Sequence, residues 1–187
     1  MYELLQPSEK YCNVLCHRDI WGGNVFFNKE TPYEKGTVFV DFQLARYLPP
    51  AIDVVMALYM NMRPGDRKQI EEECCEYYFE QFSEELRDMD LDPDNFISYE
   101  DFLLSFKEYC LFGALYNCIT ATVLRIPGDH LKNMKLHHPH DFHQYTNVDR
   151  TQEIMELMEK DKEYGKYVVE CIEDMMEFIW KENYVAP

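Results

Sequence analysis

The sequence predicts an α+β fold in which a small β element precedes a mostly helical body. Residues 11–47 hold short runs of β-branched and aromatic residues, separated by turn-forming residues, as strands are. From Pro50 onward, apolar residues recur at three- and four-residue spacing, which is the period of an α-helix. With 187 residues, the chain can bury the core of one domain or form a large part of a bigger fold.

Three short strands are expected in the β element. Their sequences are CNVLC, NVFFN and GTVFVDF, at residues 12–16, 24–28 and 36–42. The stretch between the second and third strands, KETPYEKG, combines Pro, Gly and charged residues and indicates a turn. These two strands should therefore form a hairpin.

The helical body is expected to contain five helices. They span residues 51–62, 65–89, 98–125, 148–162 and 164–183. The first is apolar almost throughout and should be buried on most faces. Ser98, with Asp101 three residues later, is expected to cap the start of the third helix. Residues 126–147 are predicted to form a loop. Helical spacing predicts that three aromatic residues belong to the core, namely Tyr109, Phe112 and Tyr116.

The composition limits the partners that the chain can have. Net charge is −17, from 35 acidic and 18 basic residues. So acidic a surface repels nucleic acid and anionic membranes, and it repels a nucleoside triphosphate unless a metal ion or a basic element intervenes. The seven cysteines form no Cys-x-x-Cys pair and are expected to be reduced and mostly buried. With no signal peptide or long apolar run evident, a soluble cytoplasmic protein is expected.

One loop carries residues of the kind that phosphoryl transfer needs. The sequence HRDIWGGN places Asp19 five residues before Asn24, and VFVDF places Asp41 at the end of the next strand. A carboxylate that accepts a hydroxyl proton, with an Asn and a second Asp that bind Mg²⁺, is the minimal set for that reaction. Asp and Asn supply the oxygen ligands that this hard cation prefers. The hairpin could bring both metal ligands side by side.

The same residues resemble the catalytic and metal-binding motifs of the kinase-like superfamily. Protein kinases carry His-Arg-Asp-Leu-x-x-x-Asn and Asp-Phe-Gly at these places. This sequence differs from them at Trp21, where protein kinases usually have Lys, and at Gln43, which replaces the Gly. Only a short connection separates Asp41 from Asp53, which leaves no room for an activation segment. A protein substrate is therefore not expected.

The chain more closely resembles small-molecule kinases of the aminoglycoside phosphotransferase and choline kinase type. Within that group, LCHRDIWGGNVFF, FVDFQLARY and PPAIDVVMALY are similar to the ecdysteroid kinase-like family, which has a CHK kinase-like domain. The resemblance runs from about residue 11 to the end of the chain and covers the C-terminal lobe of that fold. It implies one partial domain, residues 1–187, that is mostly helical, with a β-hairpin element carrying the catalytic and metal loops. It also implies an ATP-dependent phosphotransferase that acts on an alcohol group of ecdysteroid-like or other small hydroxylated compounds.

The resemblance also implies a role for each residue of the site. Asp19 would be the catalytic base, and His17 would support its loop. Asn24 and Asp41 would bind Mg²⁺ and, through it, ATP. Asp53 would hold the backbone of the catalytic loop; alternatively, it is a carboxylate favoured by the dipole at a helix N-terminus.

A full kinase also needs an N-terminal lobe that clamps the nucleotide. No Gly-x-Gly-x-x-Gly occurs in the sequence, and the seven glycines are scattered. That lobe is therefore expected to be absent, and the chain is expected to be an incomplete fragment that is inactive alone and exposes an apolar surface beside residues 12–47. A non-catalytic kinase-like remnant or interaction domain remains an alternative.

Two other constellations were weighed as metal sites. In DLDPDNFISYED, Asp90, Asp92 and Asp94 have the spacing of a calcium-binding helix–loop–helix module, but Asn95 replaces the Gly and Asp101 the bidentate Glu. An acidic turn between helices is the favoured interpretation. The four histidines of HHPHDFH match no zinc pattern and are expected to lie in a polar loop; they are His137, His138, His140 and His143.

Overall fold

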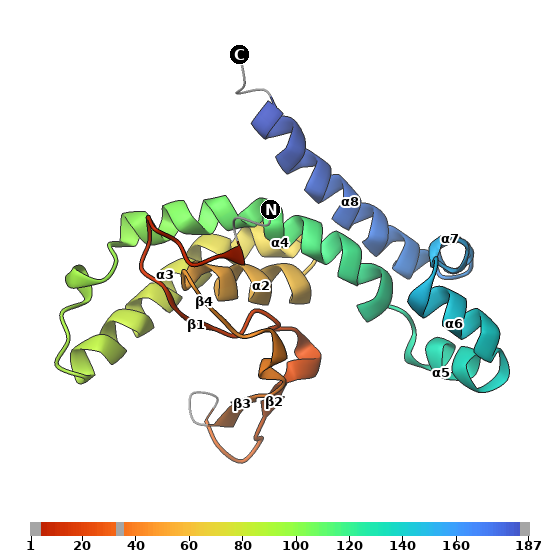
Figure 1. Cartoon of the computed structure of the whole chain (residues 1–187), viewed down its shortest axis with the longest axis horizontal. Coiled ribbons are helices and arrows are strands. Elements are labelled where there is room, and N and C mark those ends of the chain that lie inside the picture. The colour runs from red at the N-terminus through yellow and green to blue at the C-terminus, as the bar shows by residue number, and fades with distance from the viewer. Residues whose placement is uncertain (1–4, 33–35, 184–187) are drawn as a thin grey trace. The chain divides into compact units, whose positions relative to one another are not determined.

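The computed structural model describes residues 5–32 and 36–183, with side chains described up to residue 180 (Figure 1). The chain divides into two compact units, Met1–Ala114 and Leu115–Pro187. Among the described residues, the first unit holds four strands and the second is helical. The predicted α+β class, mostly helical with a small β element, is confirmed. That residues 1–187 form one lobe stays a prediction.

The β element consists of two separate two-stranded sheets. Strand β2 (Val25–Phe27) pairs antiparallel with β3 (Thr37–Phe39), with Phe26 opposite Val38, so the predicted hairpin is confirmed. Strand β1 (Val14–Cys16) pairs with β4 (Arg46–Leu48) instead of joining the hairpin. Strand β4 was not predicted, because Arg46–Leu48 contains no β-branched residue that would indicate a strand.

The core of the first unit surrounds helix α2 (Ala51–Asn61). Eight of its eleven residues are buried, as the apolar sequence predicted; they are Ala51, Ile52, Val54, Val55, Met56, Leu58, Tyr59 and Met60. Helix α3 (Pro64–Asp88) and the short η4 (Pro93–Asn95) follow. Helix α4 (Tyr99–Leu124) begins in the first unit and ends in the second. Tyr109 and Phe112 of α4 are buried in the core, as predicted.

Gly113 allows α4 to approach α2 closely, and this contact predicts a stability effect. A methyl group at Gly113 would lie 2.4 Å from Cγ1 of Val55 and 2.9 Å from Cγ of Tyr59. Gly113→Ala should therefore lower the free energy of unfolding by about 1–3 kcal/mol, measured by urea denaturation. Gly65→Ala in α3 is the control, because a methyl group there meets nothing within 4 Å. Equal effects of the two substitutions would contradict the packing seen at Gly113.

In the described part of the second unit, four helices follow α4. They are α5 (Gly128–His137), α6 (Pro139–Asn147), α7 (Thr151–Lys160) and α8 (Lys162–Asn183). The prediction of a loop over residues 126–147 was wrong, since this stretch forms α5 and α6. Pro127 precedes the first residue of α5 and Pro139 is the first residue of α6, so neither interrupts a helix. Proline is tolerated at such positions, because the first N–H groups of a helix have no partner within it.

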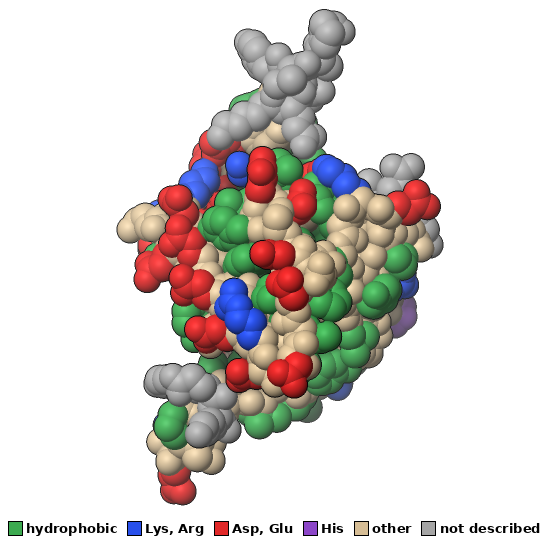
Figure 2. All heavy atoms as spheres, turned by 90° about the vertical axis from the view of Figure 1, so that its left-hand side faces the viewer, with side chains coloured by type: hydrophobic (Ala, Val, Ile, Leu, Met, Phe, Trp, Pro, Cys, Tyr) green, Lys and Arg blue, Asp and Glu red, His purple; other side chains and the backbone are tan. Residues whose placement is uncertain are grey.

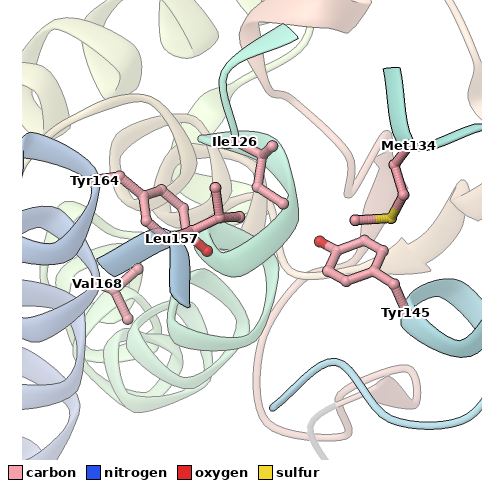
Figure 3. Close-up of a cluster of buried hydrophobic side chains, with 6 residues drawn as sticks. All are labelled: Ile126, Met134, Tyr145, Leu157, Tyr164 and Val168. Atoms are coloured by element: carbon pink, nitrogen blue, oxygen red, sulfur yellow. The ribbon is translucent and has the colours of Figure 1, made fainter. Parts of the chain in front are cut away.

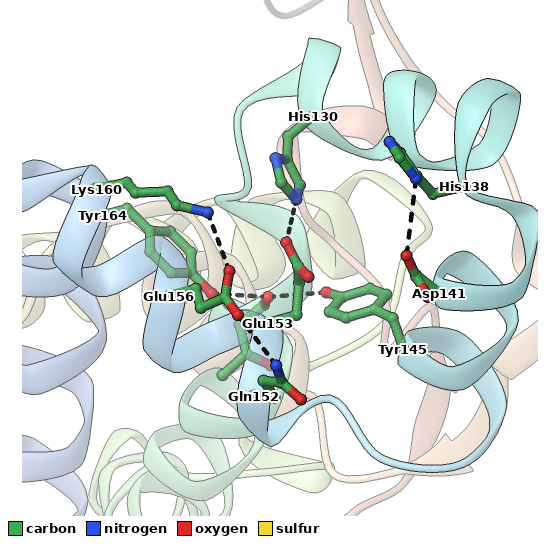
Figure 4. Close-up of polar contacts among 10 residues, drawn as sticks. His130, His138, Asp141, Tyr145, Gln152, Glu153, Glu156, Lys160 and Tyr164 are labelled. Atoms are coloured by element: carbon green, nitrogen blue, oxygen red, sulfur yellow. Dashed lines mark hydrogen bonds and ion pairs between the residues drawn. The ribbon is translucent and has the colours of Figure 1, made fainter.

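A small apolar cluster holds these helices together (Figure 3). Its buried members are Ile126, Met134, Tyr145, Leu157, Tyr164 and Val168. The hydroxyl groups of Tyr145 and Tyr164 both donate to the backbone carbonyl of Thr122, at 3.1 and 3.0 Å (Figure 4). Thr122 lies in the last turn of α4, whose carbonyls have no partner within the helix. The two tyrosines therefore fix the end of α4 to this unit.

Among the described residues, no single helix has both the length and the apolar character needed to cross a membrane. Helices α4 and α5, taken together as one bent pair, meet that criterion by length and composition.

Candidate functional site

Asp53 fixes the backbone of the loop that follows β1. It lies in the first turn of α2, and its Oδ2 and Oδ1 accept the backbone N–H groups of His17 and Arg18, each at 2.7 Å. Burial raises the pKa of Asp53, while the two backbone hydrogen bonds act in the opposite direction. The two interpretations offered for Asp53 are compatible, since it is both a first-turn carboxylate and an acceptor for the loop.

Two residues of the site have backbone angles that non-glycine residues rarely adopt. Arg18 has φ of 67° and Asp41 has φ of 65°, both in the left-handed region. A non-glycine residue there costs about 1–3 kcal/mol, so it persists only where its surroundings hold it. The bond from Arg18 N–H to Asp53 is one such restraint. Neither angle is indicated by the local sequence, since neither residue is a glycine.

His17 connects the loop to the end of β3. It is buried, its Nδ1 accepts the backbone N–H of Asp19 at 3.2 Å, and its Nε2 lies 2.8 Å from the carbonyl oxygen of Val40. A neutral ring with its hydrogen on Nε2 satisfies both contacts. The ring also packs against Phe42, with the centroids 4.4 Å apart. His17 thus sets the position of Asp19 through the backbone.

Asn24 joins the loop to the carboxylate of Asp19. Its Nδ2 donates to Oδ2 and to the backbone oxygen of Asp19, both at 2.9 Å. Asn24 is buried, and its own carbonyl accepts the backbone N–H of Val40 at 3.1 Å. With the amide nitrogen committed to Asp19, Oδ1 is the side-chain atom that Asn24 can offer to a cation.

Asp41 is the residue after Val40, which pairs with Asn24, and it lies near Asp19. Burial is the main cause that raises the pKa of Asp19, and the negative charge of Asp41 raises it further. The hydrogen bond from Asn24 acts against both effects. One oxygen of Asp41, Oδ2, lies 3.4 Å from Nε2 of Gln43. The structure therefore gathers Asp19, Asn24 and Asp41 at one end of the β2–β3 hairpin.

The donor atoms of this site fit a magnesium ion. Asn24 and Asp41 offer an amide oxygen and a carboxylate, and Mg²⁺ in proteins is usually bound through one or two such ligands together with water and substrate phosphates. Within residues 5–32 and 36–183, no group of three or more His, Cys, Asp or Glu side chains could hold a metal ion by itself. An ion at Asn24 and Asp41 would therefore need further oxygens from water or nucleotide.

The acidic turn after α3 contains two helix caps, Asp92 before η4 and Ser98 before α4. The side chain of Asp92 accepts the backbone N–H of Asp94 at 3.2 Å, and Ser98 exchanges hydrogen bonds with Asp101 at the start of α4. The predicted cap at Ser98 is confirmed. The hydrogen bonds of Asp92 and Asp101 stabilise the turn and the start of α4, as expected for an acidic turn between helices. The calcium interpretation gains no support from them.

Three of the clustered histidines lie on α5 and α6 and His138 lies between these helices, where a polar loop was expected. His138 is exposed and lies 3.9 Å from Asp141 (Figure 4), and His140, also exposed, lies 3.5 Å from the same carboxylate. The same view shows His130 bonded to Glu153 at 2.6 Å, a pair that the sequence did not suggest because 23 residues separate its members. All of these contacts are made within the second unit.

A residue of α2 that the sequence did not point to also supports the loop that carries Asp19. Asn61, the last residue of α2, donates from Nδ2 to the carbonyl oxygen of Ile20 at 2.7 Å. The residue next to Asp19 is thereby bound to the C-terminal end of the helix whose N-terminal end holds His17 and Arg18. Nothing in the spacing of Asn61 indicates this contact.

Comparison with known families agrees with the motifs. Residues 1–91 match the model of the ecdysteroid kinase-like family. This part of the chain is similar to that family. The matched residues include His17, Asp19, Asn24, Asp41 and Asp53. Comparison with curated proteins and with solved structures gave no significant match.

The ecdysteroid kinase-like match confirms the resemblance seen in the sequence and supports a kinase-like phosphotransferase as the class of protein. It covers the β element, α2 and α3. For residues 92–187, the resemblance stays a prediction.

Proposed function

We propose that the chain forms the catalytic and metal-binding part of an ATP-dependent kinase that phosphorylates an alcohol group of a small molecule, ecdysteroid-like or otherwise hydroxylated. One observation carries the proposal. The amide nitrogen of Asn24 donates to Asp19 while the backbone of Asn24 pairs with Val40, and this proximity supports the assignment of Asp19 as base and of Asn24 and Asp41 as metal ligands.

Each residue has a defined role in the proposed reaction. The acceptor hydroxyl loses its proton to the carboxylate of Asp19 as its oxygen bonds to the γ-phosphorus of ATP, and the bond from that phosphorus to the ADP oxygen breaks. Asn24 and Asp41 would hold Mg²⁺, which supplies charge neutralisation on the transferring phosphoryl group. His17 and Asp53 hold the loop that carries Asp19.

The charge of the chain makes the metal ion important for ATP binding. Acidic side chains are spread over the face shown in Figure 2, with few Lys and Arg among them. The net charge of −17 repels a free nucleoside triphosphate, so ATP would bind as its magnesium complex. For the same reason, nucleic acid and anionic membranes are not proposed as partners.

The transfer assay should use the chain fused behind the N-terminal lobe of another ecdysteroid kinase-like protein, here called the fused protein. Without Gly-x-Gly-x-x-Gly in these 187 residues, the nucleotide clamp must come from other residues. The fused protein should transfer γ-phosphate from ATP to an alcohol only with Mg²⁺, detected as the mass of the phosphorylated product. The 187-residue chain alone should show background turnover. A fused protein that binds ATP and transfers nothing to any of a broad panel of alcohols would overturn the proposal.

The raised pKa of Asp19 predicts the pH dependence of turnover. A base must be deprotonated, so the acid limb of the pH–rate profile should lie above the ordinary pKa of an Asp side chain. Asn24 lowers that pKa through its hydrogen bond, so Asn24→Ala should move the acid limb to higher pH in whatever activity remains. An acid limb at the ordinary pKa of Asp in the fused protein, unmoved in the variant, would argue against Asp19 as the base.

A second candidate function, a non-catalytic interaction domain, is favoured by the apolar surface of the β element. Its exposed large apolar side chains are Leu15, Phe26, Phe27, Val38, Phe39, Val40, Phe42 and Tyr47. The predicted exposure of apolar residues beside 12–47 is thereby confirmed. If this were the sole function, Asp19→Asn would change no measured property, whereas substitutions on this surface would.

A further inference from the structure

A groove of about 700 Å³ lies in the first unit between α2 and α3. Its lining is almost entirely apolar and aromatic, and includes Ile20, Phe39, Ala57, Leu58, Cys74 and Tyr77. The volume falls within the range of small-molecule sites, which is about 300–1,000 Å³. The groove is therefore large enough for a ligand of several rings.

The groove is continuous with the candidate functional site. Ile20 directly follows Asp19, and Phe39 precedes Asp41 by two residues. Asp53, which holds the catalytic loop, also lines the groove. A molecule in the groove thus touches the segments that carry the proposed base and metal ligand.

The chemistry of the lining selects against anions. Among the described residues that line it, the charged ones are Asp53 and Glu73, both acidic, and none is Lys, Arg or His. A carboxylate, sulfate or phosphate in the groove would lose its hydration and face like charge. Tyr77 and Tyr78, which also line the groove, instead contribute aromatic surface that suits an apolar ligand.

We propose that this groove binds the apolar body of an uncharged alcohol and excludes anionic molecules of the same shape. The assignment of that alcohol as the phosphoryl acceptor rests on the proposed function; the binding itself does not.

Binding can be measured on the 187-residue chain without nucleotide. The probes are 1-pyrenebutanol and 1-pyrenebutyrate, which share one ring system and differ in an alcohol against a carboxylate. The alcohol should bind, seen as a change in pyrene fluorescence on titration with protein, and the carboxylate should bind at least about tenfold more weakly. Equal affinity for the two probes would overturn the proposed selectivity.

Two tyrosines provide a matched pair of variants for the location of the site. Tyr77 lines the groove and is 59% exposed, whereas Tyr47 lies on β4 outside its lining and is 58% exposed. Tyr77→Ala should weaken binding of 1-pyrenebutanol by about tenfold, and Tyr47→Ala should leave it unchanged. A loss confined to Tyr47→Ala would place the probe on the exposed β element.

Thiol protection tests the location without any substitution. Cys74 lines the groove, while Cys12 and Cys118, which are also partly exposed and unpaired, do not. Bound 1-pyrenebutanol should slow alkylation of Cys74 and leave the rates at Cys12 and Cys118 unchanged, measured by peptide mass spectrometry. If Cys74 reacts at the same rate with and without saturating probe, the groove assignment fails. Because this experiment contains no ATP, its failure would not contradict the proposed phosphoryl transfer. Conversely, a fused protein that transfers no phosphate would not contradict the groove assignment.

Discussion

Asp19→Asn should lower the turnover of the fused protein by at least about 10²-fold, which is the loss expected when a general base is removed. Asn cannot accept the hydroxyl proton, yet it is similar in size and can still accept the hydrogen bond from Asn24. The fold should therefore persist, and unfolding by urea should show a free energy close to that of the parent. Rates of product formation under saturating ATP would measure the effect.

Asp94→Asn is the matched control for this substitution. Asp94 carries the same side chain in the acidic turn after α3, outside the candidate site, and its variant should keep full turnover. If the Asp94 variant lost turnover while the Asp19 variant stayed active, the kinase assignment would be contradicted. That result would favour the calcium-binding interpretation of the acidic turn.

Asp53→Ala should lower the free energy of unfolding by about 2–4 kcal/mol, because two backbone N–H groups lose a charged acceptor. Both bonds are 2.7 Å long, and one of them restrains Arg18 in its left-handed conformation. Part of the loss is offset, since removing a buried carboxylate also removes its desolvation cost. Turnover of the fused protein should fall as well, because the loop before Asp19 is freed.

Asp66→Ala separates the two interpretations of Asp53. Asp66 is the first-turn carboxylate of α3, so it shares any interaction with the helix dipole. If the dipole alone explained Asp53, both substitutions would cost the same, about 0.3–1 kcal/mol. A much larger effect at Asp53, measured by urea denaturation, is the result that the loop contacts predict.

The sequence allowed the hairpin and the proximity of the candidate site residues to be predicted, because each depends on local pattern. The roles of these residues stay a prediction. β-branched and aromatic runs predicted β2 and β3, and the spacing of Asp19, Asn24 and Asp41 predicted one site beside them. The pairing of Asn24 with Val40 then follows from the hairpin register. The position of Asp53 against the loop came from family resemblance, since 36 residues separate it from His17.

Other features depend on contacts that no local pattern shows. Helices α5 and α6 were missed, although Pro127 and Pro139 lie where these helices begin. The support of Ile20 by Asn61 and the left-handed backbone of Arg18 arise from tertiary packing. The groove between α2 and α3 is also a product of packing, since its lining combines a loop, a strand and two helices.

The most direct test of the central claim is to locate Mn²⁺, which can replace Mg²⁺ at oxygen sites, in a crystal of the fused protein with a non-hydrolysable ATP analogue. The account predicts an anomalous scattering peak bound by the side-chain oxygens of Asn24 and Asp41, next to the nucleotide phosphates. A peak at the acidic turn around Asp92 with none at Asn24 and Asp41, while the nucleotide is bound, would contradict the account.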